Sequence, residues 1–158
     1  SIQTYMTVEE FDAAEFEREY RTNVMSSFEL VKAFLPGMRE RRFGRIIALG
    51  SVNQHRPSPR LCLYAGTKAA QANLILGLAR DNAKFGITAN NVAPGVIATD
   101  RNSAVLSDAE TAGEIRKVIP AGRFGTAEDC AGLILLLASD AGSYITGEDI
   151  TIDGGMHL

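Results

Sequence analysis

The feature that most constrains the fold is a strand–helix–strand unit in the middle of the chain. A buried strand is expected in the apolar run Arg45-Ile46-Ile47-Ala48-Leu49-Gly50. A helix is expected over residues 64–84, with Gly86 as its stop, and a second strand over residues 87–92. Because strands joined by a helical crossover pair in parallel, this unit predicts an α/β fold with right-handed connections.

The rest of the chain supplies further helices and one more strand. Thr7 and Glu10 have the spacing of a capping box, which predicts that a helix begins there. Helical character with one break is expected over residues 16–41, because apolar residues recur there at spacings of three and four. The remaining expected elements are a mobile helical lid over residues 102–118, a helix over residues 128–139 and a strand over Asp149–Ile152.

Tyr64 and Lys68 are the first candidate functional residues. On the predicted helix they stand one turn apart on the same face. An ammonium beside a phenol favours the phenolate, so we expect the pKa of Tyr64 to fall toward the working pH, as acid/base chemistry on an alcohol or ketone requires. Ser51 follows the first predicted strand, so its hydroxyl is expected at a strand's carboxyl end, where ligands bind in open α/β sheets.

A chance Tyr-x-x-x-Lys is expected in roughly a quarter of such chains, so its neighbours decide its meaning. They are Gly44-Arg45-Ile46-Ile47-Ala48-Leu49-Gly50-Ser51, Asn90-Asn91-Val92-Ala93-Pro94-Gly95-Val96-Ile97-Ala98-Thr99, Pro120-Ala121-Gly122-Arg123-Phe124-Gly125, Ser143-Tyr144-Ile145-Thr146-Gly147 and Asp153-Gly154-Gly155. In this order the chain resembles the short-chain dehydrogenase/reductases, of the 3-oxoacyl-carrier-protein reductase and sugar or polyol dehydrogenase type. The spacing from Tyr64 to Lys68 differs from that of the enoyl-reductase subgroup, in which the two residues are farther apart.

The resemblance also implies which part of a fold this chain carries. It implies a Rossmann-like doubly wound parallel sheet, represented here by its carboxyl-terminal part of three parallel strands with flanking helices. No Gly-x-x-x-Gly-x-Gly or Gly-x-Gly-x-x-Gly turn opens a helix in the sequence, and the family's Asn-Asn-Ala-Gly segment is absent. Residues 1–158 are therefore expected to form a single catalytic domain that lacks its amino-terminal strands and dinucleotide-binding segment.

Chemical roles follow from the resemblance. It implies that Tyr64 protonates the ketone oxygen or removes the alcohol proton, and that Lys68 lowers the pKa of Tyr64 and binds the nicotinamide ribose. Ser51 is implied to hold the substrate oxygen. Asn23 matches a helix-interrupting asparagine whose carbonyl helps to anchor a water that passes protons to the lysine.

The loop after the second predicted strand is implied to meet the cofactor, NAD or NADP. Backbone groups near Val96 and Ile97 are expected to bond the nicotinamide carboxamide, and the Thr99 hydroxyl to reach the carboxamide or a phosphate. Pro94-Gly95 alone would mark any tight turn. The choice between the two cofactors depends on residues after the family's second strand, which this sequence does not contain.

Three further residues are candidates for substrate contact. Asn53 and His55 lie in the polar, basic segment between Ser51 and Tyr64, where the family shapes its substrate pocket. That composition favours a polyhydroxylated or acidic alcohol or ketone, although the prolines of the segment are equally suited to stiffen a plain loop. Arg101 begins the lid, where it could meet an anionic substrate group or remain a solvated surface residue.

Composition limits the class of protein. With 46% apolar residues the chain can bury a core, and a net charge of −3 argues against a nucleic-acid partner. No apolar run approaches the ~18 residues of a membrane span. Cys62 and Cys130 are far apart, which favours a reduced, cytoplasmic location. With His55 and His157 they form no metal-binding pattern, so no metal is expected.

Two functional hypotheses follow. The first is an NAD(P)-dependent oxidoreductase that moves hydride between nicotinamide and a secondary alcohol or ketone. The second is a catalytically silent fragment that acts only through association. In either case the resemblance implies a homotetramer or homodimer packed through the helices at residues 15–41 and 64–84.

Overall fold

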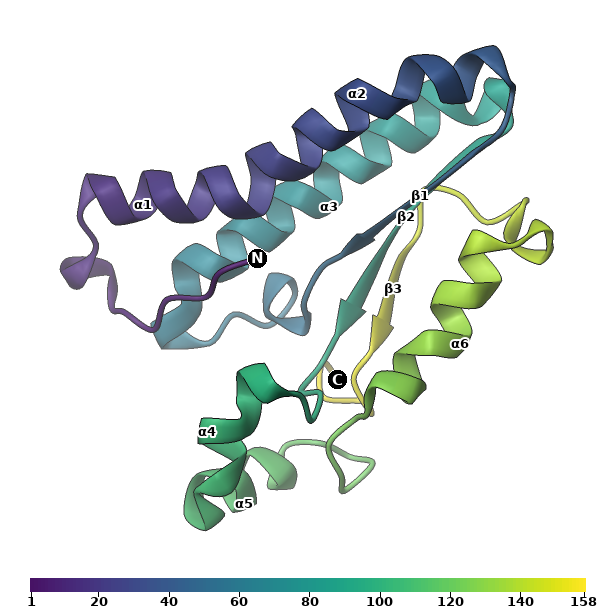
Figure 1. Ribbon diagram of the computed structural model, residues 1–158. Coiled ribbons are helices and arrows are strands. Elements are labelled where there is room, and N and C mark those ends of the chain that lie inside the picture. The colour runs from purple at the N-terminus through teal and green to yellow at the C-terminus, as the bar shows by residue number, and fades with distance from the viewer.

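The computed structural model describes all 158 residues as three layers, with a parallel sheet between two sets of helices (Figure 1). In chain order the elements are α1 Ala13–Tyr20, α2 Ser26–Glu40, β1 Gly44–Leu49, α3 Cys62–Asn82, β2 Ile87–Pro94, α4 Ser103–Ser107, α5 Ala109–Lys117, α6 Ala127–Ala138 and β3 Asp149–Ile152. The strand order is β1-β2-β3, and both pairings are parallel. The predicted fold class is therefore confirmed.

The three strands end at one edge of the sheet, and the site lies there. Leu49 at the end of β1 pairs with Val92 in β2, and Pro94 at the end of β2 pairs with Ile152 at the end of β3. The helices α4 and α5 lie beyond this edge, on the connection that leaves β2 (Figure 1). The segment predicted as a lid is thus helical, as two short helices.

Small residues let α3 lie close to one face of the sheet. Ala79 and Ile75 of α3 pack against Ala48 of β1 and Ala89 of β2, and all four are buried. The helix α6 covers the opposite face (Figure 1). Close approach of α3 to β1 brings the first turns of α3 to the carboxyl end of that strand, which positions the site. None of the helices is both long and apolar enough to span a bilayer.

The predicted break in the first long helix is a π-helical turn, Arg21–Met25, between α1 and α2. Asn23 and Val24 are buried in this turn. A π turn holds one residue more than an α turn, and such turns recur at functional sites. Here the extra residue lets the Asn23 side chain turn inward, where it bonds both backbone groups of Ile2 at 2.8 Å.

The capping box predicted at Thr7 is present, but the helix that begins there is only a 3₁₀ turn. Thr7 precedes only a short 3₁₀ turn, Val8–Glu10, in which the Thr7 N–H donates to Glu10 Oε2 at 2.7 Å. Phe11 has extended backbone, so the turn does not continue. The α-helix begins after Asp12, whose carboxylate accepts from the Glu15 N–H at 2.8 Å.

Gly86 ends the helical segment as predicted, and its conformation makes it difficult to replace. Its φ is 71°, and a Cβ added there would lie 2.6 Å from the Arg42 carbonyl oxygen. Gly86→Ala is therefore expected to lower the free energy of unfolding by about 2 kcal/mol or more. Urea denaturation followed by circular dichroism measures this.

Gly77→Ala is the matched control, since Gly77 lies inside α3 with no atom within 4 Å of an added Cβ. It is expected to raise the free energy of unfolding by up to about 1 kcal/mol. Equal effects of the two substitutions would contradict the left-handed conformation at Gly86.

Candidate active site

Tyr64 and Lys68 lie on the first turns of α3 and face the same cavity. Both are buried, with 6% and 4% of their surfaces exposed. Lys68 Nζ lies 5.8 Å from the centre of the Tyr64 ring. The structure thus brings the two residues together as their spacing predicts.

The Lys68 amine is anchored to the end of β1. Nζ donates to the Leu49 carbonyl oxygen at 2.6 Å and to Gln71 Oε1 at 3.1 Å. Burial lowers the pKa of Lys68 from 10.5 to about 8, and the positive charge of Arg101 acts in the same direction. Lys68 therefore exchanges its proton much closer to neutral pH than an exposed lysine does.

The expected fall in the pKa of Tyr64 is wrong. Burial raises the pKa of Tyr64 above its ordinary value, while the Ser51 hydroxyl and the charge of Arg101 oppose the rise only in part. The physical reason is that the phenol is desolvated, whereas the Lys68 amine is directed to the Leu49 carbonyl and to Gln71. The neutral phenol is therefore the favoured form near neutral pH.

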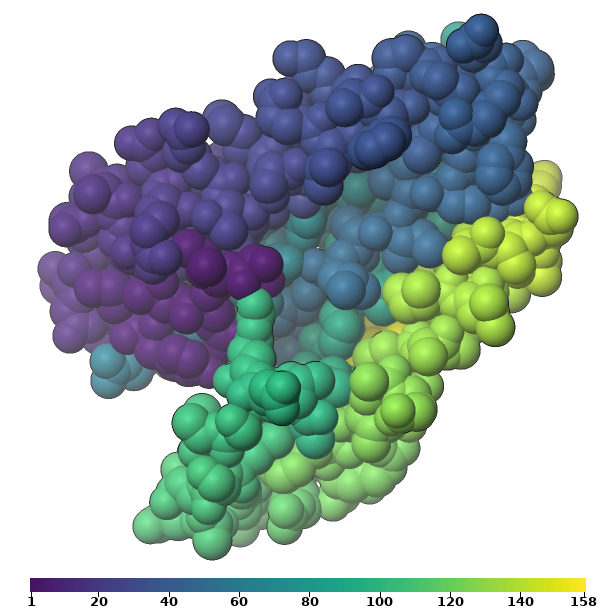
Figure 2. Space-filling view, in the orientation of Figure 1, coloured from purple at the N-terminus to yellow at the C-terminus, as the bar shows by residue number.

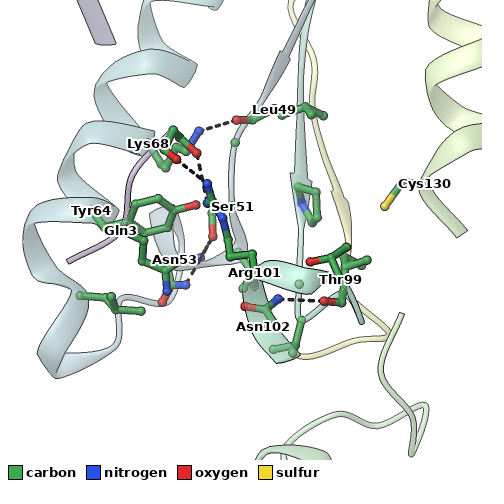
Figure 3. Close-up of a pocket in the computed structure, with 18 of the residues that line it drawn as sticks. Gln3, Leu49, Ser51, Asn53, Tyr64, Lys68, Thr99, Arg101, Asn102 and Cys130 are labelled. Atoms are coloured by element: carbon green, nitrogen blue, oxygen red, sulfur yellow. Dashed lines mark hydrogen bonds between the residues drawn. The ribbon is translucent and has the colours of Figure 1, made fainter. Parts of the chain in front are cut away.

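Ser51 begins a braced turn at the end of β1. Its Oγ accepts from the Asn53 N–H at 3.2 Å and from Asn53 Nδ2 at 3.4 Å, and its own N–H donates to Gln54 Oε1 at 3.1 Å. Gln54 Nε2 in turn donates to Asp149 Oδ2 at 2.6 Å. Figure 3 shows the hydroxyls of Ser51 and Tyr64 at the same side of the cavity. The turn that carries Ser51 is thus tied to β3.

Asn23 holds the turn of α3 that carries Tyr64. Its Nδ2 donates to Thr67 Oγ1 at 3.1 Å, and the Thr67 hydroxyl donates to the Tyr64 carbonyl oxygen at 2.7 Å. The π turn, the N-terminal segment and the start of α3 therefore form one connected unit.

Gln71 is a site residue that the sequence analysis missed. Its Oε1 accepts from Lys68, and its Nε2 donates to Ser27 Oγ at 2.7 Å. The Ser27 hydroxyl donates to the Asn23 carbonyl oxygen at 3.5 Å. A chain of side chains thus joins Lys68 to the carbonyl of Asn23. Its position three residues after Lys68, on the same helix face, is the signal that could have revealed Gln71.

The loop after β2 presents unpaired donors to the cavity. The N–H groups of Val96 and Ile97 donate to no other group of the chain, and neither does the Thr99 hydroxyl. The carbonyl oxygens of the same loop are occupied, since Val96 O accepts from the Gly125 N–H and Ile97 O from Asn102 Nδ2. Gly95 is required there, because a Cβ would lie 2.6 Å from that of Asp153. The loop therefore suits a ligand that accepts hydrogen bonds, such as the carbonyl oxygen of a carboxamide.

One cavity of about 1170 Å³ collects almost all of the predicted site residues. Figure 2 shows the hollow between the N-terminal segment, the lid and α6. The predicted residues that line it are Asn23, Ser51, Asn53, Tyr64, Lys68, Pro94, Gly95, Val96, Ile97, Thr99 and Arg101. His55 is the exception, because it lies outside the cavity with its Nε2 3.4 Å from Asp149 Oδ2. Cys130 lines the cavity although no pattern in the sequence indicated it.

Comparison with known proteins identifies the family. A family model described as enoyl-(acyl carrier protein) reductase matches residues 2–157. The 3-oxoacyl-[acyl-carrier-protein] reductase FabG of Haemophilus influenzae is 44% identical over 138 residues, which cover 87% of this chain and 56% of that protein. The chain belongs to the short-chain dehydrogenase/reductase family.

Solved structures of short-chain dehydrogenase/reductases superpose closely on this chain. A gluconate 5-dehydrogenase from Burkholderia cenocepacia J2315, in complex with NADP and tartrate, has a TM-score of 0.95 at 33% identity and is matched over 99% of this chain and 61% of its own. A 3-oxoacyl (acyl-carrier-protein) reductase from Agrobacterium tumefaciens C58 with NADP bound has a TM-score of 0.93 at 36% identity, over 98% of this chain and 61% of its own. The resemblance to the reductase and sugar dehydrogenase type is thus confirmed. The chain spans about half the length of the curated relatives that it matches.

The lowered pKa of Lys68 makes the stability of this short-chain dehydrogenase/reductase chain depend on pH. Between pH 8 and the ordinary lysine value of 10.5, the unfolded state binds a proton that the folded state does not. The free energy of unfolding is therefore expected to rise with pH in this window, by up to about 1.4 kcal/mol per pH unit. Above pH 10 the raised pKa of Tyr64 opposes the trend, because the unfolded tyrosine then loses its proton first.

Urea denaturation at a series of pH values between 8 and 10 measures this dependence. The Lys68→Met variant is the control and should lose the rise. The same slope in both proteins would contradict the burial of the amine as its cause.

Gln71 is expected to set the pKa of Lys68 together with burial. Gln71→Leu removes a hydrogen-bond acceptor of the ammonium and should lower the pKa of Lys68 below about 8. Gln71→Glu places a negative charge at the same position and should raise the pKa of Lys68. NMR titration of the lysine side-chain signals measures both shifts. A Lys68 pKa that is unchanged in both variants would show that Gln71 only fills space.

Proposed function

We propose that the protein is an NAD(P)-dependent oxidoreductase that interconverts a ketone and a secondary alcohol by a Tyr-Lys-Ser-Asn mechanism. The observation that carries the proposal is the shared cavity. Tyr64, Ser51 and Lys68 line it together with Val96 and Ile97, whose N–H groups are unpaired, and this supports the proposal. A proton donor, an oxygen-binding hydroxyl and a carboxamide-binding loop therefore face one space.

Tyr64 acts as the proton donor to the substrate oxygen in ketone reduction. Its raised pKa supports this direction, because the phenol holds its proton near neutral pH and gives it up to an oxygen that becomes an alkoxide. In alcohol oxidation the same group must first lose its proton, so oxidation is favoured at higher pH. Ser51 donates a second hydrogen bond to the substrate oxygen, worth a few kcal/mol where the bond strengthens in the transition state.

Lys68 stabilises the charge on Tyr64, and Asn23 holds both residues in position. A protonated Lys68 stabilises the phenolate that remains after proton transfer, and its pKa of about 8 lets it take up or release a proton during the cycle. The side chains of Gln71 and Ser27 link Lys68 to the Asn23 carbonyl, which holds the amine in place. Asn23 also bonds the α3 turn through Thr67, so a single residue positions both members of the pair.

The residues of the β2 loop fit the nicotinamide end of NAD or NADP. The Val96 and Ile97 N–H groups suit the carboxamide oxygen, the Thr99 hydroxyl suits the carboxamide or a phosphate, and the Lys68 amine suits the ribose hydroxyls. The nicotinamide, when bound, supplies or accepts the hydride. Bound NADP in the similar gluconate 5-dehydrogenase and 3-oxoacyl reductase structures supports this assignment.

The second candidate function is association without turnover. The exposed aromatic side chains of α1 and α2 favour it, since Phe16, Phe28 and Phe34 lie about half exposed or more. The long helix pair, over residues 15–41 and 62–82, would then pack against a second copy in a homodimer or homotetramer. Catalysis and association are compatible, and only cofactor binding separates an active chain from a silent one.

Titration of this 158-residue chain with NADH and NADPH, followed by fluorescence, is the test. Micromolar binding supports the oxidoreductase. Absence of binding by this chain supports association alone, which light scattering then measures.

Tyr64→Phe is expected to lower kcat for reduction of a ketone by about 10²- to 10⁴-fold, because the proton donor is removed. The affinity for NADPH should change little. Tyr144→Phe is the matched control, since Tyr144 is fully exposed and outside the cavity. Steady-state kinetics measure both variants. Equal kcat in the Tyr64→Phe variant and the unaltered protein would overturn the assignment of Tyr64.

A further inference from the structure

The cavity has an unbalanced charge. Among the side chains that line it, only those of Lys68 and Arg101 are charged, and none is an aspartate or glutamate. A concave site that holds cations without carboxylates attracts anions and disfavours cationic ligands. This asymmetry calls for an anionic group in the ligand.

Arg101 reaches into this cavity from the start of the lid. It lies in the 3₁₀ turn Asp100–Asn102, between the β2 loop and α4. Its Nη1 donates to Ser1 Oγ at 3.2 Å, and its Nη2 donates to the Ser1 carbonyl oxygen. Figure 3 shows the side chain extending toward Ser51 and Tyr64, on the side of the cavity where the substrate oxygen would bind. Its charge acts there, since it adds to the lowering of the Lys68 pKa by burial and opposes the rise that burial causes in the pKa of Tyr64.

No carboxylate neutralises Arg101. Its two partners are a hydroxyl and a carbonyl oxygen, and no Asp or Glu lies within 4.0 Å of its guanidinium. The arginines of the neighbouring polar segment differ. Arg56 bonds the Met156 carbonyl oxygen and Arg60 lies 4.0 Å from Glu10, and neither of them lines the cavity. Arg101 is therefore the cation available to a ligand beside the Tyr64–Ser51 pair.

From this geometry we infer that Arg101 binds a carboxylate of the substrate, so that the substrate is a keto acid or hydroxy acid. The inference rests on the proposed function, because it names the substrate class of the same site. A guanidinium matches a carboxylate with two parallel hydrogen bonds, which are stronger than its bonds to the neutral oxygens of Ser1. Arg101 would exchange one set of partners for the other as the acid enters.

The carboxylate also has a consequence for Lys68. Arg101 helps to lower the pKa of Lys68, so an anion bound to Arg101 offsets that charge. The pKa of Lys68 then rises, and the protonated form that stabilises a phenolate at Tyr64 becomes more populated. Binding of an acid would thus prepare the site for proton transfer, whereas a neutral alcohol of the same size would not.

The test compares D-gluconate with D-glucitol, which has the same carbon chain but a hydroxymethyl group in place of the carboxylate. Binding of each probe to the chain is measured by calorimetry at constant ionic strength. The unaltered protein should prefer gluconate. Arg101→Gln should weaken gluconate binding by about 10- to 100-fold and leave glucitol unchanged, as expected for loss of a charged hydrogen-bonding partner.

Two variants make the comparison specific. Arg101→Lys keeps the charge and should retain part of the preference for gluconate. Arg60→Gln removes an arginine outside the cavity and should change neither affinity. The inference is overturned if the unaltered protein binds gluconate no better than glucitol, or if Arg101→Gln affects both probes equally.

A cofactor phosphate presents similar chemistry, so NADPH binding to Arg101→Gln is measured in parallel. Loss of NADPH affinity with gluconate binding unchanged would assign Arg101 to the cofactor and overturn the inference. The results that contradict the proposed function differ from those that contradict the role of Arg101. A chain that binds gluconate through Arg101 but reduces no ketone contradicts only the oxidoreductase, whereas an active enzyme without carboxylate preference contradicts only the role of Arg101.

Discussion

Burial of the Lys68 amine at the end of β1 is the constraint on which the site depends. An amine removed from water must find acceptors inside the protein, and it finds the Leu49 carbonyl and the Gln71 amide. The first acceptor belongs to the sheet and the second to α3, so satisfying the amine holds the helix to the strand end. The small residues of α3, such as Ala72 and Ala79, permit this approach because they are buried without adding bulk. The position of Tyr64 follows from the same packing.

The chemistry of the cavity is set by desolvation more than by pairing of opposite charges. Both members of the Tyr64–Lys68 pair are shifted toward their neutral forms, the phenol upward in pKa and the amine downward. With a pKa of about 8, Lys68 still keeps most of its proton at neutral pH, so the resting cavity carries the positive charges of Lys68 and Arg101. Negative charge is brought by the ligands. It changes the pKa values of the buried groups because little water is present to screen it. Ion pairs between its own side chains therefore contribute little to the stability of such a site.

Local patterns in the sequence correctly predicted those secondary-structure elements that are determined by their own residues. The β3 bounds and the Gly86 stop agree with the structure because an apolar run and a turn residue determine them. The differences arise from backbone conformations and side-chain contacts that a spacing pattern does not encode. Extended backbone at Phe11 moves the first helix, and the partners of Lys68 lie 19 residues before it and three after it. The spacing of Tyr64 and Lys68 indicated their proximity correctly, but it held no information on where the amine would point.

The π turn between α1 and α2 constrains how this helix can change in length. A π turn holds one residue more than an α turn, so removing one residue from Arg21–Met25 would turn this segment into an ordinary α turn while α1 and α2 keep their relative orientation. The Asn23 side chain would then no longer point into the protein, and its hydrogen bonds to Ile2 and Thr67 would be lost. Point substitutions here act on single bonds, whereas a one-residue deletion would disconnect the N-terminal segment from the site. Deletions are therefore expected to be tolerated in the loops before α1 and after α2, and not within these five positions.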